Sequence, residues 1–517
     1  MNSRLNIKND FGVFVSLAIY VFFVMFFVSS DSYTHDMYGR WDSAWFFMCG
    51  KALMNGMTPY VDYTDSKGLF LWVIYGLGYL LSPRNYLGVF WISCAAYTVT
   101  FYCVYRLAKL LLKDARCAIV CTLLMTLAFF NNILHSETRA EDFCLAFLVV
   151  SLYRTSLLLY SECVSAKTID CTFLLLGFCF GSIFMIKYNI AAMQSIFVLY
   201  SLVWVIRERR GWLRAILLLF IGFAVVVLPM VLFMIGKGCF GDFIHEYFYN
   251  TIQTVTGGES NIILYLRDWQ AVLADKYRIA LLVAIVIGCL LFARHADRYR
   301  WFPLVSSFFI YALTTRHAYW IYYYLSCSFL LFWLMLSLSR LPFFASIRHH
   351  LMAMAIVIGG FCAVLNMTLG NYYQTMFWND GKARTIFYDM QYLMSQVDSP
   401  TLFYAFQADQ GYGIVCGALP GGKYWAKQNG ATNDMNEEHK RELLSGKSDF
   451  VFVKHPERLL RNGVTKDMLE DIGYQVCYKF GESYLLTKRN VSHPSVPVHL
   501  TNWDILFKRY PAPFKIE

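Results

Sequence analysis

A series of long apolar segments, separated by short polar breaks, limits what this chain can fold into more than any other feature. They lie near residues 11–30, 86–112, 117–135, 143–160, 171–187, 190–206, 212–235, 279–293, 301–315, 318–338 and 351–370. Most approach the ~20 apolar residues that an α-helix needs to cross a bilayer. Only 15% of the 517 residues are charged, against roughly 25% in soluble domains. The sequence therefore predicts an α-helical polytopic membrane protein with about 11 transmembrane helices, the first of them uncleaved.

One further apolar run, from Gly68 to Ser82, decides the orientation. As a helix it reaches about 22 Å, short of the roughly 30 Å hydrocarbon core. If it does not span, the basic loops near 207–214 and 294–300 share the cytoplasmic side with the N-terminus, as the positive-inside rule requires. We therefore expect this run to lie in the membrane interface or to be re-entrant. Residues 31–85 then form one long extracytoplasmic loop.

The net charge of +10 reflects the usual Lys and Arg excess in cytoplasmic loops. It does not by itself indicate an anionic partner, and the sequence carries no nucleic-acid-binding motif. The fifteen cysteines are scattered through apolar runs without the paired spacing of metal ligands. We therefore expect a lipid bilayer as the surroundings, and no metal, cofactor or nucleic acid.

Beyond Gly370 the pattern becomes that of a soluble domain. Short β-like runs, "TLFYAF" (401–406), "FVFVK" (450–454), "YQVCYKF" (474–480) and "SYLLTK" (483–488), predict strands. Between them, "MNEEHKRELLSG" and "VTKDMLEDIG" predict helices that end at a glycine. The expected organisation is a transmembrane domain over 1–370 and a small extracytoplasmic α/β domain over 371–517.

Two stretches in the long external loops predict helices that lie on the membrane surface. The stretch "DSAWFFMCGKALMNG", which begins at Asp42, indicates an amphipathic helix, because apolar residues recur in it at helical spacing: Trp45, Met48, Cys49 and Ala52. In the loop 236–278, "GDFIHEYFYNTI" indicates a second one. His245 and Glu246 are expected on its polar face.

Charged residues gather on the expected outer side of the membrane. Four separate links supply them: Asp36, Asp42, Asp62, Asp65 and Lys67; Arg139, Glu141 and Asp142; Lys187; and Arg316 with His317. Ionisable side chains at membrane depth are costly and are functional candidates by default. The pattern indicates a shared polar cavity, with snorkelling of each side chain to water as the alternative.

The stretch "WDSAWFFMCGKALMNGMTPYVDYTDSKGLF" resembles the first external loop of GT-C membrane glycosyltransferases, which include protein O-mannosyltransferases and lipid A aminoarabinose transferases. "ETRAEDFCLAF" resembles their second acidic link, and "FMIKYN" resembles a Lys-containing segment at the outer end of a middle helix. Three departures concern the sugar and the acceptor more than the reaction. Asp42-Ser43 stands where the mannosyltransferases have Asp-Glu, "KGLF" lacks the prolines usual after that Lys, and "KYN" replaces "K-G".

The resemblance implies a GT-C-like fold and transfer of a sugar from a polyprenyl-phosphate donor to a hydroxyl of a glycan, lipid or protein acceptor. It implies an active site on the extracytoplasmic side of a bacterial inner membrane. Asp42 is the expected catalytic base, since one carboxylate can accept the proton of the attacking hydroxyl. The expected donor-phosphate ligands are Lys67, Lys187 and Arg139, since cations stabilise a departing phosphate. The expected ligands of the acceptor or the rest of the substrate are Asp36, Asp62, Glu141, Asp142, Arg316 and His317.

Alternatives remain open at several of these positions. Asp42 is also a good N-cap for the helix that follows it, and Asp36 is a second candidate for the base. Lys67 can serve as a headgroup anchor, and His317 as a structural histidine. For the whole chain, the alternatives are an oligosaccharide ligase or oligosaccharyltransferase, and a transporter or flippase of lipid-linked glycans.

Overall fold

The structure is a computed structural model, and it places most of the chain in two compact units. It describes residues 7–32, 42–130, 138–256, 261–296, 298–315, 321–369, 382–408, 411–427, 431–480 and 482–492. Unit 1 comprises residues 1–29, 92–231 and 259–370, and unit 2 comprises 30–91, 232–258 and 371–517. Two long helices continue from one unit into the other, because the boundaries at residues 91/92 and 231/232 fall inside them.

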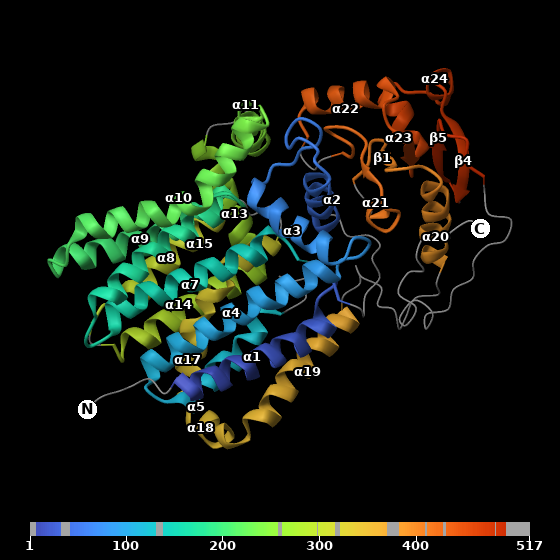
Figure 1. Ribbon diagram of the computed structural model, residues 1–517. Helices are drawn as coiled ribbons and strands as arrows, with labels where there is room; N and C mark the ends of the chain where they lie inside the picture. Colours follow the sequence, from blue (N-terminus) through green and yellow to red (C-terminus); the bar gives the residue numbers. More distant parts are fainter. Residues whose placement is uncertain are drawn as a thin grey trace. The chain divides into compact units, whose positions relative to one another are not determined.

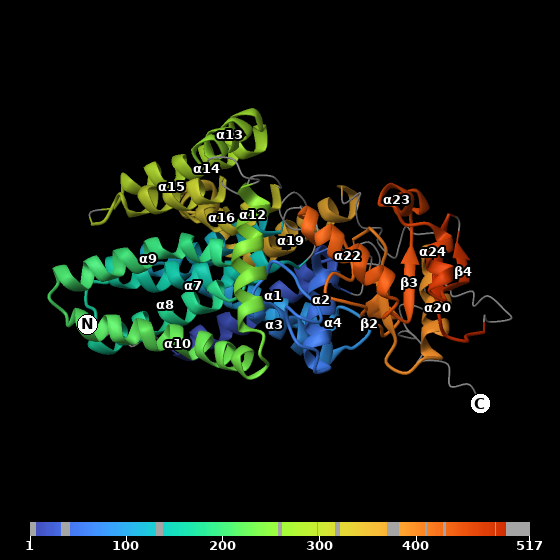
Figure 2. The same ribbon diagram turned by 90° about the horizontal axis from the view of Figure 1, so that it is seen from above.

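Unit 1 is built from helices, drawn from blue to yellow in Figure 1. Their bounds are α1 (Ile7–Val28), α4 (Leu87–Leu112), α5 (Ala115–Leu124), α6 (Thr126–Phe129), α7 (Ala140–Tyr160), α8 (Ala166–Phe184), α9 (Tyr188–Arg207), α10 (Trp212–Gly236), α13 (Asn261–Ala274), α14 (Lys276–Ala293), α15 (Phe302–Thr315), α16 (Leu325–Ser328), α17 (Phe332–Leu338), α18 (Pro342–Ile347) and α19 (Leu351–Leu369). Helices α7, α8 and α9 pack side by side (Figures 1 and 2). Every apolar segment expected from the sequence coincides with one or more of these helices.

Among the described residues, seven helices are long and apolar enough to cross a membrane: α1, α4, α7, α8, α9, α10 and α14. The apolar stretches of α5–α6, α15, α16–α17 and α19 are shorter. Helix α10 exposes large apolar side chains such as Leu217, Phe220 and Leu228, as expected of a helix that faces lipid. The predicted polytopic membrane fold is confirmed.

Glycines bring α8 and α10 into backbone contact. A Cβ atom added at Gly177 would lie 2.0 Å from the carbonyl oxygen of Leu219, and one added at Gly222 would lie 2.1 Å from that of Leu174. Small residues allow such close approach between membrane helices, where dispersion contacts stabilise association. Any larger side chain at either glycine forces the two helices apart.

Unit 2 combines two loop regions with a small sheet. Its helices are α2 (Asp42–Met54), α3 (Leu69–Leu81), α11 (Phe240–Ile244), a π-helical turn (His245–Asn250), α12 (Thr251–Thr256), α20 (Lys382–Ser395), α21 (Tyr412–Val415), α22 (Asn433–Ser445), α23 (Pro456–Arg461) and α24 (Lys466–Asp471). Its strands are β1 (Thr401–Tyr404), β2 (Leu419–Pro420), β3 (Phe450–Val453), β4 (Gln475–Phe480) and β5 (Ser483–Thr487). The sheet order is β2-β1-β3-β5-β4; β1 runs parallel to β2 and β3, and β5 runs antiparallel to β3 and β4.

The predicted α/β character of the C-terminal region is confirmed. All four predicted strands are present, and the sequence analysis missed only the short β2 among the described strands. The two predicted helices are α22 and α24. The glycines that follow them, Gly446 and Gly473, have φ angles of +64° and +102°, which residues with a side chain rarely adopt. The predicted domain boundary at 370/371 lies outside the described residues and stays a prediction.

Helix α2 is present as predicted, but it does not expose the polar face expected of an amphipathic helix. Every residue from Ser43 to Ala52 is buried inside unit 2. The reason is close packing on two sides. A Cβ atom at Gly50 would lie 2.4 Å from the backbone nitrogen of Gly76 in α3, and α2 also packs against α21 and β2. Local spacing shows one apolar face of a helix, whereas here the opposite face is covered by residues distant in sequence.

Candidate active site

The structure brings Asp42, Asp65 and Lys67 close together in unit 2. Asp42 is half-buried and begins α2, and Lys67 lies two residues before α3. The Nζ atom of Lys67 lies 3.9 Å from Asp65 Oδ2 and 5.5 Å from the ring centroid of Phe46, within the range of a cation–π contact. Asp42 is near enough that its charge acts on Asp65. A base candidate and a cation candidate therefore share one loop.

Asp65 is the buried member of this group. Only 9% of its surface is exposed, and burial raises the pKa of its carboxyl group, partly opposed by the charge of Lys67 and reinforced by that of Asp42. Its Oδ1 atom accepts a long hydrogen bond of 3.4 Å from the Ser66 hydroxyl. Burial disfavours the ionised form of a carboxyl group unless donors or cations compensate.

Asp62, an expected substrate ligand, is exposed. Its Oδ2 atom accepts a hydrogen bond of 2.6 Å from the backbone N–H of Thr58 and so closes a turn. The same turn contains Tyr60, at φ +64°, whose hydroxyl donates to the Lys67 carbonyl at 3.0 Å. This turn fixes the backbone that precedes α3, and the substrate role of Asp62 stays a prediction.

A segment near the other end of the chain covers this loop. We call residues 411–427 the clamp segment. The buried Nζ of Lys51 donates to the Ala418 carbonyl at 2.6 Å, and the Trp45 and Trp425 rings lie 4.4 Å apart between centroids. The backbone N–H of Thr64, beside Asp65, donates to the Lys423 carbonyl at 3.1 Å. The clamp segment therefore sets the position of both α2 and the turn that carries Asp65.

Glu246 anchors the clamp segment, and its expected place on a polar helix face is wrong. It is 3% exposed and lies in the π-helical turn. Its Oε1 atom pairs with Lys423 Nζ at 2.7 Å and accepts from the Tyr424 hydroxyl at 3.0 Å, while Asn250 Nδ2 donates to Oε2 at 2.9 Å. A sequence window around Glu246 does not reveal these partners, because the clamp residues lie about 180 positions further along the chain.

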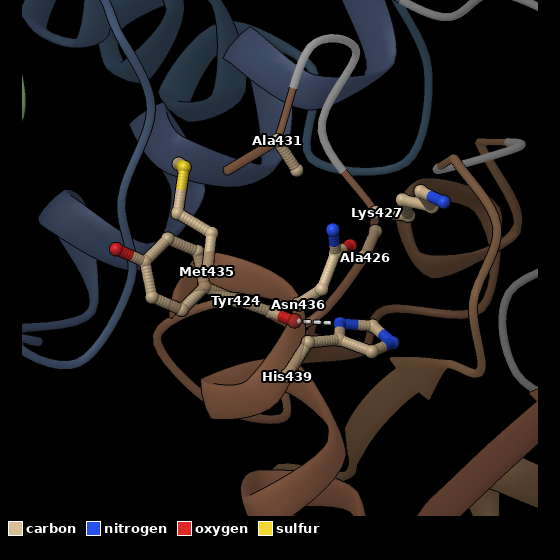
Figure 3. A pocket seen from close by; sticks show the side chains of 7 residues that line it. All are labelled: Tyr424, Ala426, Lys427, Ala431, Met435, Asn436 and His439. Atoms are coloured by element: carbon tan, nitrogen blue, oxygen red, sulfur yellow. Dashed lines mark hydrogen bonds between the residues drawn. The ribbon is translucent and has the colours of Figure 1, made fainter. Parts of the chain in front are cut away.

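The clamp segment is also held by helix α22, next to a small pocket (Figure 3). His439 Nδ1 donates to the Tyr424 carbonyl at 2.6 Å, and its Nε2 accepts from the backbone N–H of Phe406 at 3.0 Å. This arrangement requires the neutral ring with its proton on Nδ1, and burial lowers the pKa of His439 to about 4. Glu442 accepts hydrogen bonds from the backbone N–H groups of Lys423 and Tyr424 at 2.7 and 2.8 Å.

In unit 1, Arg139 and Asp142 form the start of α7. The Oδ2 atom of Asp142 accepts from the backbone N–H of Arg139 at 2.8 Å, and its Oδ1 accepts from the Tyr97 hydroxyl at 2.5 Å. Asp142 is 3% exposed, so both carboxylate oxygens are engaged in holding α7 and α4. The predicted roles of Arg139 and Asp142 toward substrate stay predictions.

Lys187 and Glu141 form a buried ion pair in unit 1, between Lys187 Nζ and Glu141 Oε1. The ammonium group also lies 4.1 Å from the ring centroid of Tyr323. A small pocket adjoins the pair, and Asn189 lines it together with these three residues. The Oδ1 atom of Asn189 is buried and accepts no hydrogen bond from the described residues. The structure thus places a carboxylate, an ammonium, an amide and an aromatic ring at one pocket.

Three expected ligands, Asp36, Arg316 and His317, lie outside the described residues, and their roles stay predictions. Within the described ranges, no group of three or more His, Cys, Asp or Glu side chains is arranged to hold a metal ion.

The chain is similar to known proteins both in part of its sequence and in its fold. Residues 67–235 match the model of the family described as dolichyl-phosphate-mannose-protein mannosyltransferase. No curated protein sequence matches the chain. Among solved structures, ArnT from Cupriavidus metallidurans bound to undecaprenyl phosphate is similar over 92% of this chain and 98% of its own, with a TM-score of 0.60 and 12% identity. Its apo state gives a TM-score of 0.61 over 93% and 98%.

The chain has a GT-C fold. The resemblance expected from the sequence motifs is confirmed at this level. The sequence analysis placed Asp65 among the charged residues of the first loop but gave neither Asp65 nor Lys51 a role of its own, and it placed Glu246 on a polar helix face. The available signal was the presence of ionisable residues inside otherwise apolar or aromatic stretches, "FMCGKALM" and "FIHEYFY", which marks a buried partner elsewhere in the fold.

Proposed function

We propose that this protein is an integral membrane glycosyltransferase that moves a sugar from a polyprenyl-phosphate donor to a hydroxyl of a glycan, lipid or protein acceptor. The site is proposed to face the extracytoplasmic side of a bacterial inner membrane. One observation carries the proposal: the GT-C fold, shared over 92% of the chain with an ArnT whose crystal structure holds undecaprenyl phosphate. At 12% identity this likeness concerns the fold, so the sugar and acceptor classes rest on the chemistry of the site.

The chemistry requires a base for the acceptor and cations for the leaving group. The acceptor hydroxyl gives its proton to a carboxylate while its oxygen bonds to the anomeric carbon, and the bond from that carbon to the phosphate oxygen breaks. The lipid phosphate leaves with the electron pair and needs positive charge, but no general acid. Asp42 and Lys67, which lie on one loop of unit 2, are the proposed base and phosphate ligand.

The two lysines expected to bind phosphate differ in their surroundings. At Lys187, a phosphate has to compete with the carboxylate of Glu141, which already contacts the ammonium group. At Lys67, the pair with Asp65 is 3.9 Å long, and the ammonium group donates to the Ser66 hydroxyl at 3.0 Å. Lys67 lies in the same unit as Asp42, the proposed base, and is therefore the stronger candidate.

The transporter alternative predicts ionisable residues on interrupted helices near the bilayer midplane. In this chain the charged candidates of unit 1 lie at helix ends: Arg139 directly precedes α7, and Lys187 lies between α8 and α9. This placement favours an enzyme with its site at the membrane surface.

A transfer assay with purified full-length protein tests the proposal. The protein is incubated with a panel of polyprenyl-phosphate sugars and with lipid, glycan and peptide acceptors, and Asp42→Asn protein serves as the inactive reference. Sugar transfer that depends on Asp42 supports the function, and no transfer or donor hydrolysis across the panel contradicts it. The orientation is tested with a reporter enzyme that works only outside the cytoplasm. Fused after Gly370, this reporter should be active.

A further inference from the structure

Asp65 carries a buried carboxylate oxygen that the described part of the fold does not satisfy. Its Oδ2 atom accepts no hydrogen bond from the described residues, and Lys67 Nζ is 3.9 Å away. Hydrogen bonds to a carboxylate have donor–acceptor distances of about 2.7–2.9 Å. A buried polar atom without a partner is rare in native structures and calls for a specific explanation.

The neighbours of this carboxylate compensate its burial only in part. Burial and, to a smaller extent, the charge of Asp42 raise the pKa of Asp65, while the charge of Lys67 and hydrogen bonds from Ser66 oppose this rise. The other buried carboxylates described above behave differently. Glu246 and Asp142 each have hydrogen-bond donors on both oxygens. Retention of a costly carboxylate at one place, beside the proposed base, is typical of a residue kept for binding or chemistry.

We propose that Asp65 is a substrate-binding residue whose Oδ2 atom accepts a hydrogen bond from a hydroxyl or amino group of a bound sugar or of the acceptor. In its ionised form Asp65 does not bind a phosphate directly, because two anionic groups repel each other in a site of low dielectric constant. The charges of the two side chains assign their roles: Lys67 binds the phosphate, while Asp65 binds a neutral or cationic hydrogen-bond donor next to Asp42. This inference rests on the proposed function and adds to it a polar substrate group and its ligand.

The test compares carboxylate-to-amide variants in the full-length protein. Asp65→Asn keeps the size of the side chain and removes the negative charge. Glu246→Gln makes the same change at a buried carboxylate that has its partners, and Asp471→Asn makes it at an exposed position at the end of α24. For each variant we would measure the thermal midpoint, the affinity for undecaprenyl phosphate alone, and the kcat and KM of the transfer reaction found with the wild type.

For Asp65→Asn we expect a midpoint equal to or above that of the wild type, because no hydrogen bond to Oδ2 is lost and a buried charge is removed. We expect undecaprenyl phosphate to bind at least as tightly. Transfer should fall by about 10- to 100-fold in kcat/KM, the value of one hydrogen bond to a charged group. Asp65→Glu, which keeps the charge, should recover part of the loss, while Asp471→Asn should behave as the wild type.

The KM values for the two substrates show which of them carries the polar group that Asp65 binds. A higher KM for the sugar-bearing donor assigns the group to the sugar, and a higher KM for the acceptor assigns it to the acceptor. Unchanged transfer by Asp65→Asn overturns the inference. So does a lower midpoint or weaker binding of undecaprenyl phosphate, because either shows that Asp65 supports the fold or orients Lys67. Since the wild type and Asp42→Asn are assayed in parallel, failure of the inference is distinct from failure of the proposed function.

Discussion

Glu246 and Lys423 form an ion pair, 2.7 Å from Oε1 to Nζ, that ties the π-helical turn His245–Asn250 to the clamp segment within unit 2. Glu246 is almost fully buried, whereas the Lys423 side chain is 22% exposed. The peptide of Lys423 in turn accepts from Thr64, beside Asp65. The position of the proposed substrate ligand therefore depends on a carboxylate far from it in sequence.

Replacing Glu246 with Gln should lower the free energy of unfolding by about 2–3 kcal/mol. Loss of one partner of a buried ion pair costs roughly 3–5 kcal/mol, and the partial exposure of Lys423 reduces this. Thermal or denaturant unfolding of the full chain in detergent measures the effect. Glu437→Gln, on the exposed face of α22, is the matched control. Equal midpoints for the two variants would show that Glu246 does not anchor the clamp segment.

Acid should destabilise unit 2 through His439. Its pKa is about 4 in the folded protein and about 6.5 in an unfolded chain, so between these values the unfolded state binds more protons. Stability therefore falls as the pH drops from about 6.5 to 4, by about 3 kcal/mol in total. His439→Gln should show a shallower pH dependence of the unfolding midpoint, whereas His455→Gln, at a more exposed histidine, should keep the wild-type slope. Identical slopes in all three proteins would contradict this.

Asp42→Asn should leave the protein folded and almost inactive. Loss of a general base typically lowers the rate by about 10²–10⁴-fold, and Asn retains most of the helix-capping ability of Asp. The measurement is turnover of the donor that the panel identifies, together with donor binding and the unfolding midpoint. Near-normal turnover in Asp42→Asn combined with loss of activity in Asp36→Asn would transfer the role to Asp36.

Lys67→Met should weaken the binding of undecaprenyl phosphate, because Met keeps the length of the side chain but removes the positive charge that contacts a phosphate. Direct binding measurement with the lipid phosphate checks it. Unchanged affinity would remove Lys67 from the phosphate site.

Lys187→Met should act mainly on stability. It leaves Glu141, which is 2% exposed, without the ammonium group that contacts its Oε1 atom, at a cost of about 3 kcal/mol. The double variant Lys187→Met/Glu141→Gln should recover much of this loss, since it removes the uncompensated charge as well. A double variant as unstable as Lys187→Met alone would show that the effect does not arise from the charge pair.

The sequence predicts this fold well where one local pattern decides the structure. Apolar length places the membrane helices, short β-like runs place β1, β3, β4 and β5, and Gly446 and Gly473 end helices because their backbone needs positive φ. The grouping of an acidic residue with Lys67 in the first loop also follows from the quoted motif.

Long-range partners explain what the sequence does not reveal. Lys51 looks like a polar position on a surface helix, until the Ala418 carbonyl is found beside its ammonium group. Glu246 looks solvated until Lys423 and Tyr424 close over it. In both cases a polar residue is buried because its partner comes from the clamp segment, and a local window holds no information about that partner. The unsatisfied Oδ2 atom of Asp65 is likewise recognised only when the structure shows the residues around it.

The contact between Lys51 and Ala418 joins residues 367 positions apart, and this separation has a consequence for biogenesis. At a translation rate of ~5–20 residues per second, the ribosome adds the clamp segment tens of seconds after α2 has been made. During that interval the helices of unit 1 enter the bilayer, while the segment that carries Asp42 and Lys67 still lacks its contacts with the clamp segment. The candidate site is therefore completed only after the clamp segment has been made, and a chain released by the ribosome before residue 411 lacks the partner of Lys51.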